Sequence, residues 1–194
     1  MKKIIAKQTH SSIVQKVDRH THSWGQYDGM ITDDLSVALV AYGADCALIA
    51  FWDDKKIGIC HAGWKGFVEG IIENILNNFT IEVRCHIAPF LHEFEIKRDT
   101  CYELIREKFG DRYFRYENTK IIFEFRRAIV HSLESIPYTI DDRSTIDHPT
   151  LASFRRDKKK GNGTQNRLVV WRDYKNNVHT SLFYPKEEIV LWHP

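Results

Sequence analysis

Short apolar runs rich in β-branched residues alternate with polar turns over the first third of the chain, and this pattern predicts a succession of β-strands. The run from Ser36 to Tyr42 is almost continuously apolar, as expected of a strand buried on both faces. The polar turn from Asp53 to Lys56 joins two further runs into a predicted antiparallel hairpin. This hairpin brings Cys46, before its first strand, beside His61, after its second. The predicted strands here are residues 4–5, 13–17, 29–32, 36–42, 47–52 and 57–60.

Helical periodicity begins after His61. Apolar residues recur at helical spacing from Gly63 to Phe79, which predicts one amphipathic helix packed on the sheet. A second helix is expected over Lys97–Phe109, and Gly110 is its stop signal. Its inward-facing residues are expected to be Leu104, Ile105 and Phe109.

The second half of the chain is less regular. Residues 121–123 can begin as a strand, whereas Phe125, Ile129 and Leu133 repeat at helical spacing, so we expect a helix from about Glu124 to Glu134. Further strands are predicted at residues 81–88, 151–154, 167–171 and 188–192.

Composition bounds the class of protein. With 194 residues, 43% hydrophobic and 28% charged, and no Pro/Ser-rich linker, the chain is expected to form one soluble domain over residues 1–194. A net charge of +2 makes no strong case for a nucleic-acid partner, so none is expected, and the Lys158–Lys160 run is interpreted as a solvated loop. No apolar run approaches bilayer length or forms a signal peptide, so we expect no membrane partner and a cytoplasmic location. The four cysteines lack paired short spacings, which favours free thiols.

Three residues far apart in the sequence can form a metal site. His10, at a predicted strand end, can join Cys46 and His61, and two imidazoles with one thiolate suit zinc. Three protein ligands leave a fourth position open, as catalytic zinc sites do. Two other interpretations stay open: a metal-free nucleophilic Cys46–His61 pair, and a buried cysteine with a hydrogen-bonded core histidine. The two glycines around Trp64 argue against simple packing.

Further polar residues are candidates for catalysis or substrate binding. Asp45 can orient a ligand histidine, act as a general base, or cap its turn. Lys65, Arg155, Arg156 and Arg167 are candidate anion contacts, because cationic side chains, and guanidinium groups in particular, bind phosphate oxygens. For each of the four taken alone, a surface charge or a salt-bridge partner is the favoured interpretation.

Between Lys7 and Trp171 the chain carries an ordered set of motifs. They are Lys7-Gln8-Thr9-His10, Asp28-Gly29-Met30-Ile31-Thr32, Ala44-Asp45-Cys46, Cys60-His61-Ala62-Gly63-Trp64-Lys65-Gly66, Ala88-Pro89 with Phe94-Glu95-Ile96, and Ser153-Phe154-Arg155-Arg156-Asp157. This set resembles the laccase-domain family, also called the multicopper polyphenol oxidoreductase or polyphenol oxidase family. The resemblance implies an α/β fold, a single domain of mixed β-sheets covered by helices in α-β-β-α layers.

The same resemblance implies a function. It places three zinc ligands on His10, Cys46 and His61. It implies phosphorolysis of adenosine, inosine, guanosine or methylthioadenosine, and hydrolytic deamination of adenosine, with a purine nucleoside and phosphate as partners. The alternatives are a copper-dependent phenol oxidase, for which the paired histidine motifs are not found, and a peptidoglycan-precursor editing hydrolase. A zinc-stabilised binding protein is the non-enzymatic alternative.

The chain also departs from the family pattern. Members usually carry a longer segment, with strands and an Asn-Arg pair, before the Gln-x-His motif, so we expect contacts from that segment to be absent here. Ala88-Pro89 stands where Gly-Pro is usual, and Ser144-Thr145 where Cys-Thr is usual. We expect residues 173–194 to add a strand segment that replaces the N-terminal strands. The sequence leaves the oligomeric state open.

Overall fold

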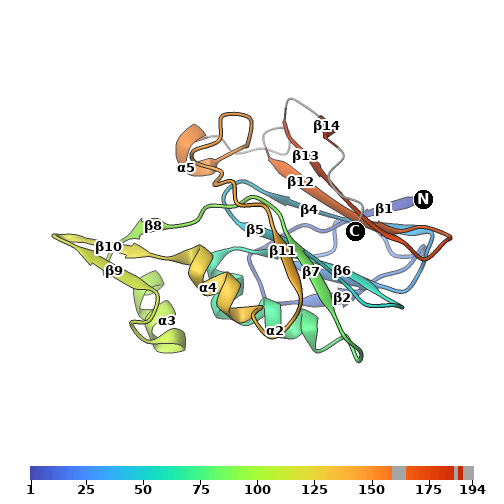
Figure 1. The fold of residues 1–194 in the computed structure, drawn as a ribbon, viewed down its shortest axis with the longest axis horizontal. Helices are drawn as coiled ribbons and strands as arrows, with labels where there is room; N and C mark the ends of the chain where they lie inside the picture. Colours follow the sequence, from blue (N-terminus) through green and yellow to red (C-terminus); the bar gives the residue numbers. More distant parts are fainter. Residues whose placement is uncertain (159–164, 186–187, 190–194) are drawn as a thin grey trace.

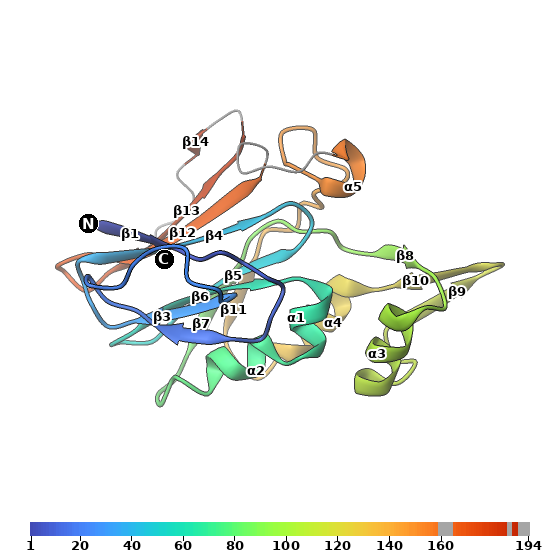
Figure 2. The same ribbon diagram turned by 180° about the vertical axis from the view of Figure 1, so that it is seen from behind.

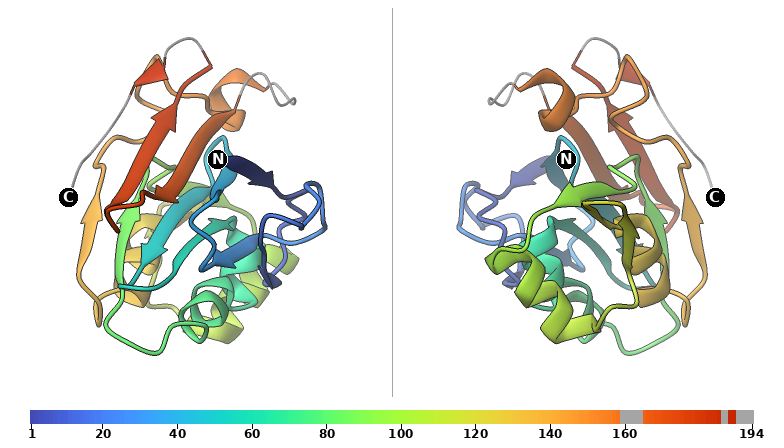
Figure 3. Two further views of the ribbon diagram at one scale, coloured as in Figure 1. Left: turned by 90° about the vertical axis from the view of Figure 1, so that its right-hand side faces the viewer. Right: turned by 90° about the vertical axis from the view of Figure 1, so that its left-hand side faces the viewer.

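The computed structural model describes residues 1–158, 165–185 and 188–189 of the chain. Two β-sheets lie face to face, and helices cover the far face of one of them (Figure 1, Figure 3). The predicted α/β class with mixed sheets is confirmed. Lys159 and Lys160 of the predicted lysine-rich loop, and residues 190–192 of the last predicted strand, lie outside the described residues.

The first sheet has five strands in the order β1-β4-β12-β13-β14. Strand β1 runs parallel to β4, whereas β12 runs antiparallel to both β4 and β13. The continuously apolar run predicted as a strand is β4, which is buried at all of its positions except Tyr42. The strands are β1 (Lys2–Ile5), β4 (Val37–Gly43), β12 (Asn166–Arg172), β13 (Val178–Phe183) and β14 (Glu188–Ile189).

The second sheet has six strands in the order β11-β7-β5-β6-β3-β2. The predicted hairpin is its centre: β5 and β6 pair antiparallel, with Leu48 opposite His61 and Ala47 opposite Ala62. Strand β3 continues the sheet on the other side of β6, with Gly29 opposite Cys60. The strands are β2 (Val14–Lys16), β3 (Gly29–Thr32), β5 (Ala47–Trp52), β6 (Ile57–Ala62), β7 (Arg84–Ile87) and β11 (Tyr138–Ile140).

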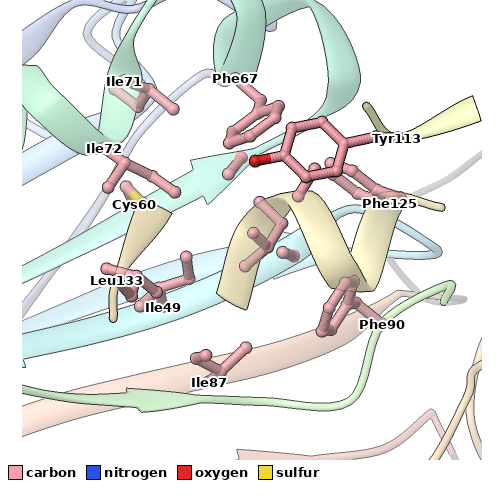
Figure 4. Packing of buried hydrophobic residues seen from close by; sticks show 14 of the residues in the cluster. Ile49, Cys60, Phe67, Ile71, Ile72, Ile87, Phe90, Tyr113, Phe125 and Leu133 are labelled. Atoms are coloured by element: carbon pink, nitrogen blue, oxygen red, sulfur yellow. The ribbon is translucent and has the colours of Figure 1, made fainter. Parts of the chain in front are cut away.

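The hydrophobic core has two layers because the side chains of a strand alternate between its two faces. In β5, Leu48 and Ala50 pack between the sheets, while Ile49 and Phe51 pack against the helices. Figure 4 shows the helix-side layer, where Ile49 lies with aromatic residues such as Phe90. The six-stranded sheet is therefore buried on both faces, and polar side chains can be placed where its strands end and the loops begin.

The helices are α1 (Trp64–Val68), α2 (Ile71–Leu76), α3 (Thr100–Phe109), α4 (Phe125–Ser132) and α5 (Phe154–Asp157). Helices α1, α2 and α4 lie on the six-stranded sheet, while α5 lies on the opposite side of the molecule (Figure 1, Figure 2). Helix α3 and a third, antiparallel sheet form an arm that projects from the body (Figure 2). Its strands are β8 (Phe94–Ile96), β9 (Phe114–Glu117) and β10 (Lys120–Phe123). None of the described helices has the length and apolar character needed to cross a bilayer.

Several local predictions are wrong. The single helix predicted over residues 63–79 is interrupted at Gly70, whose φ of 92° lies in the left-handed region that glycine tolerates. The strand predicted at residues 151–154 does not form, because the Ser153 hydroxyl accepts a hydrogen bond from the Arg156 backbone N–H and caps α5 instead. Leu104, predicted to face inward, is 38% exposed, while its neighbour Ile105 is fully buried.

Candidate metal centre

His10, Cys46 and His61 converge at one end of the six-stranded sheet. Their nearest donor atoms all lie within 4.8 Å of one another, and they are the one group of this kind found among the described residues. Cys46 Sγ lies 3.8 Å from His10 Nε2, and the two imidazole rings meet edge to face with centroids 4.7 Å apart. The β5–β6 register explains the Cys46–His61 pair, because Cys46 directly precedes β5 and His61 is the penultimate residue of β6.

A buried aspartate that the sequence analysis did not select holds two of these residues. Asp28 is 3% exposed, and its carboxylate accepts the backbone N–H of His10 at 3.0 Å and the imidazole Nδ1–H of His61 at 2.8 Å. It also accepts the backbone N–H groups of Thr9 and Ser11, at 3.0 and 2.8 Å. This ring of donors supports the left-handed backbone of His10, with φ of 61°. Because Nδ1 of His61 carries the proton toward Asp28, we assign Nε2 as the nitrogen that faces the centre.

The two glycines of the predicted motif leave space for this arrangement. A Cβ atom at Gly63 would lie 2.5 Å from a ring carbon of His10 and 3.2 Å from Cys46 Sγ. At Gly66, a Cβ atom would lie 2.6 Å from the backbone oxygen of Ser11. The glycines are thus required by close approach, one to the side chains of the centre and one to the backbone that carries His10.

Neighbouring ionisable groups shift the pKa values of Cys46, His61 and Asp28 in the direction that favours their charged forms. Burial raises the pKa of the Cys46 thiol, but the nearby His61 and His10 outweigh that effect and lower this pKa to about 6. Burial likewise lowers the pKa of His61, yet the Cys46 thiolate and the Asp28 carboxylate raise it to about 9. Burial raises the pKa of Asp28, but the hydrogen bonds from His61 and the backbone hold it well below its usual range. At neutral pH the metal-free centre therefore contains a thiolate, which is the form that ligates a metal.

A pocket with a volume of about 480 Å³ opens onto the three side chains. Its polar contributors besides them are Gln8, Asp45, Arg155 and Gln165. Its apolar wall consists mainly of aromatic rings from α1, β8, α4 and α5, together with one leucine: Trp64, Leu91, Phe94, Phe125 and Phe154. The pocket thus joins an aromatic wall to a cluster of metal-ligating atoms.

Asp45 and Arg155 both line this pocket. The Asp45 carboxylate accepts hydrogen bonds from the Thr145 hydroxyl at 2.7 Å and from the Arg155 backbone N–H at 2.8 Å. The Arg155 guanidinium lies 4.5 Å from the centroid of the Phe94 ring and makes no ion pair within the described residues. The carboxylate that orients His61 is therefore Asp28, whereas the Asp45 carboxylate binds Thr145 and the backbone of Arg155.

The other predicted anion contacts do not line the pocket. The Arg156 guanidinium donates to backbone carbonyls of the 145–151 loop and to Asp157, so it stabilises that loop. Lys65 lies 3.7 Å from Glu69 on the exposed side of α1. Arg167 lies over the ring of Phe183 on the five-stranded sheet, 5.9 Å from its centroid. The structure therefore brings one of the four cations, Arg155, to the pocket.

The residues present fit a divalent metal ion. Imidazole nitrogens and thiolate sulfur are zinc donors, and three protein ligands are the number found at catalytic zinc sites. The glycine cradle keeps the space around their donor atoms clear, and Asp28 directs the His61 ring as histidine ligands of metals are usually directed.

Comparisons with known proteins agree with this picture. A family model described as multi-copper polyphenol oxidoreductase laccase matches residues 1–172. A purine nucleoside phosphorylase of Aquifex aeolicus is 31% identical over 69% of this chain, which spans 66% of that relative. One of Borreliella burgdorferi is 30% identical over 86% of this chain and 77% of the relative. The solved structure of the Neisseria meningitidis protein NMB0706 shares the fold, with a TM-score of 0.73 at 18% identity, over 88% of this chain and 76% of that one.

Proposed function

This chain belongs to the family described as multi-copper polyphenol oxidoreductase laccase, and we propose that it acts as a metal-dependent purine nucleoside phosphorylase. The observation that carries the proposal is the convergence of His10, Cys46 and His61 at the pocket. The names of the relatives supply the substrate class, purine nucleosides with phosphate. The fold alone would not distinguish this activity from others.

We assign the three converging side chains as the ligands of a zinc ion. When bound, zinc with an open position supplies Lewis-acid chemistry and lowers the pKa of a water molecule toward neutrality. Multicopper oxidation needs additional clusters of histidines, and the described residues contain a single candidate group. Zinc is therefore preferred over copper.

The pocket suits a nucleoside and an anion together. Its volume of about 480 Å³ is in the ordinary range for small-molecule sites. The aromatic wall offers ring faces on which a flat purine base can stack. Arg155 offers a guanidinium without a carboxylate partner among the described residues, which is suited to phosphate oxygens. In phosphorolysis a phosphate oxygen replaces the base nitrogen on the anomeric carbon of the sugar. The active site therefore has to hold the base, the sugar and phosphate at the same time.

Neighbouring residues hold the side chains of this site in a fixed geometry. Asp28 holds the proton on Nδ1 of His61 and fixes the backbone of His10, so neither ligand has to reorganise. Trp64 and the phenylalanines give the pocket an apolar side against which the base can pack. Deamination of adenosine is proposed as a second reaction of the same site, since an open position beside the base is what hydrolytic attack requires.

Purified protein incubated with adenosine, with and without phosphate, tests the proposal. Release of adenine that requires phosphate is the expected result, while inosine formed without phosphate reports deamination. Cys46→Ser should abolish both products, and Cys101→Ser, which changes a half-buried cysteine outside the pocket lining, should abolish neither. Products that persist in Cys46→Ser contradict the proposed centre. Oxidation of a phenol by a copper-loaded sample, with no nucleoside cleavage, would favour the oxidase alternative.

A further inference from the structure

Asp45 contacts three segments that are far apart in the sequence, at Leu91, Thr145 and Arg155, and two of these residues, Leu91 and Arg155, line the pocket. It is 8% exposed, and its φ of 92° lies in a region that side chains other than glycine rarely adopt. Its carboxylate contacts the Thr145 hydroxyl and the Arg155 N–H, and its own carbonyl accepts the Leu91 N–H at 2.9 Å. A backbone under strain persists only where its surroundings determine it, and here the three contacts do so.

Both oxygens of Asp45 are engaged by donors of the protein itself. One accepts from a hydroxyl and the other from a backbone N–H, at 2.7 and 2.8 Å. A general base needs a lone pair directed at the proton that it removes. The geometry of Asp45 instead resembles that of a structural carboxylate, in which each of the two oxygens is fixed by a hydrogen bond.

The contact to Arg155 has a consequence for the pocket. The Asp45 bond holds the backbone of Arg155 in the first turn of α5, and the guanidinium of the same residue extends to the ring of Phe94 on the pocket wall. Cys46 follows Asp45 directly, so one dipeptide carries the thiolate of the centre and contacts the backbone of the pocket arginine.

We propose that Asp45 is a positioning residue that sets Arg155 at the distance from Cys46 at which a phosphate is bound between the arginine and the metal centre. The inference rests on the proposed function, because phosphate is the anion of that reaction. Asp45 acts through Arg155 and does not exchange a proton with the substrate.

Two substitutions separate positioning from base catalysis. Asp45→Asn can keep both contacts, because its amide oxygen accepts from the Arg155 N–H while its amide nitrogen donates to the Thr145 hydroxyl, which accepts as readily as it donates. Asparagine also tolerates the left-handed backbone. Asp45→Gly removes both carboxylate contacts, and glycine accepts a φ of 92° without strain.

Steady-state kinetics of the metal-loaded enzyme test the inference. Asp45→Gly should raise KM for phosphate by about 10-fold to 100-fold, as loss of positioning does, with KM for the nucleoside and metal content unchanged. Asp45→Asn should restore KM for phosphate to within about 3-fold of the wild-type value and keep kcat. Arg155→Ala should reproduce the effect of Asp45→Gly. A collapse of kcat in Asp45→Asn at saturating phosphate would identify a general base and overturn the inference.

Controls matched to each variant exist in the chain. Asp53 is a second buried aspartate, which accepts backbone N–H groups in the β5–β6 turn, so Asp53→Ala should leave KM for phosphate unchanged. Arg167→Ala, which removes an arginine over Phe183 outside the pocket lining, should do the same.

The thermal stabilisation of the metal-loaded protein by inorganic phosphate gives a readout that does not depend on turnover. Phosphate should raise the Tm of the wild type and of Asp45→Asn, and should raise that of Asp45→Gly much less. If the wild type binds phosphate in this way but cleaves no nucleoside, the proposed function fails while the inference stands. Equal stabilisation of Asp45→Gly and wild type, or no stabilisation of the wild type, overturns the inference.

Discussion

Replacing Asp28 by asparagine tests how the centre is held together. One oxygen of Asp28 accepts from His10 N–H and His61 Nδ1–H, and the other accepts from the N–H groups of Thr9 and Ser11. An asparagine has one oxygen and one NH₂ group at these positions. Whichever carboxylate oxygen the NH₂ group replaces, at least two N–H groups of the protein then face this NH₂ group and lose their hydrogen-bond acceptor.

The structure sets the magnitude of the loss. Hydrogen bonds to a charged acceptor contribute about 1.5–3 kcal/mol each, so the loss of two destabilises the fold by about 3–6 kcal/mol. If the new NH₂ group faces His61, the ring can accept at Nδ1 only by carrying its proton on Nε2, the nitrogen assigned to the metal. Metal affinity should therefore fall by about 10-fold to 100-fold, as it does when residues that orient a ligand are changed.

Two measurements check this prediction. Competition with a chromophoric chelator gives the zinc affinity of Asp28→Asn and wild type, and urea unfolding of both metal-free proteins gives the stability difference. Asp53→Asn is the control, because it changes another buried aspartate in a turn distant from the pocket residues. An Asp28→Asn protein that binds zinc as tightly as wild type would refute the role given to Asp28.

Three further predictions follow from the same structure. Gly63→Ala should destabilise the protein by about 1–3 kcal/mol and weaken metal binding, since the new methyl group would overlap the His10 ring. A metal titration measures the loss of affinity, and an unchanged metal affinity would contradict the role given to Gly63. In metal-free protein, the alkylation rate of Cys46 should rise through about pH 6 and level off above it, because its lowered pKa leaves the thiolate dominant from that pH upward. Cys101, whose pKa is raised to about 12, should not react at neutral pH. Mass spectrometry after iodoacetamide treatment measures both rates, and a midpoint near pH 9 for Cys46 would contradict the prediction. Deleting residues 174–194 removes β13 with its buried side chains and should destabilise the fold by on the order of 5 kcal/mol or more; a truncated protein with unchanged cooperative unfolding would exclude a structural role for this segment.

Much of the central sheet could be predicted because its information is local. The apolar runs of β4, β5 and β6, with the polar turn at Asp53–Lys56, define the hairpin without reference to other segments. Once the hairpin is accepted, the proximity of Cys46 and His61 follows from antiparallel pairing. The glycines of the Gly63–Gly66 turn then indicate a close approach, although what they approach is visible only in the structure.

The remaining features depend on contacts between distant segments. Asp28 reaches His61 because β3 pairs with β6, a register that no local pattern specifies. Leu151 and Ala152 are buried like strand residues, yet Asn166 bonds both the N–H and the carbonyl of Ala152, so this segment leads into α5 and not into a sheet. The arm strands β8 and β9 were not predicted, because their runs are short and interrupted by charged residues.

Metal analysis of the purified, untagged protein tests the central claim most directly. Mass spectrometry of wild-type protein should find about one zinc ion per chain, because we propose that the three converging side chains bind one such ion. Cys46→Ser should lose that ion, and Cys101→Ser should retain it. A wild-type protein without a stoichiometric metal after zinc loading, or equal metal in Cys46→Ser and wild type, would contradict the account.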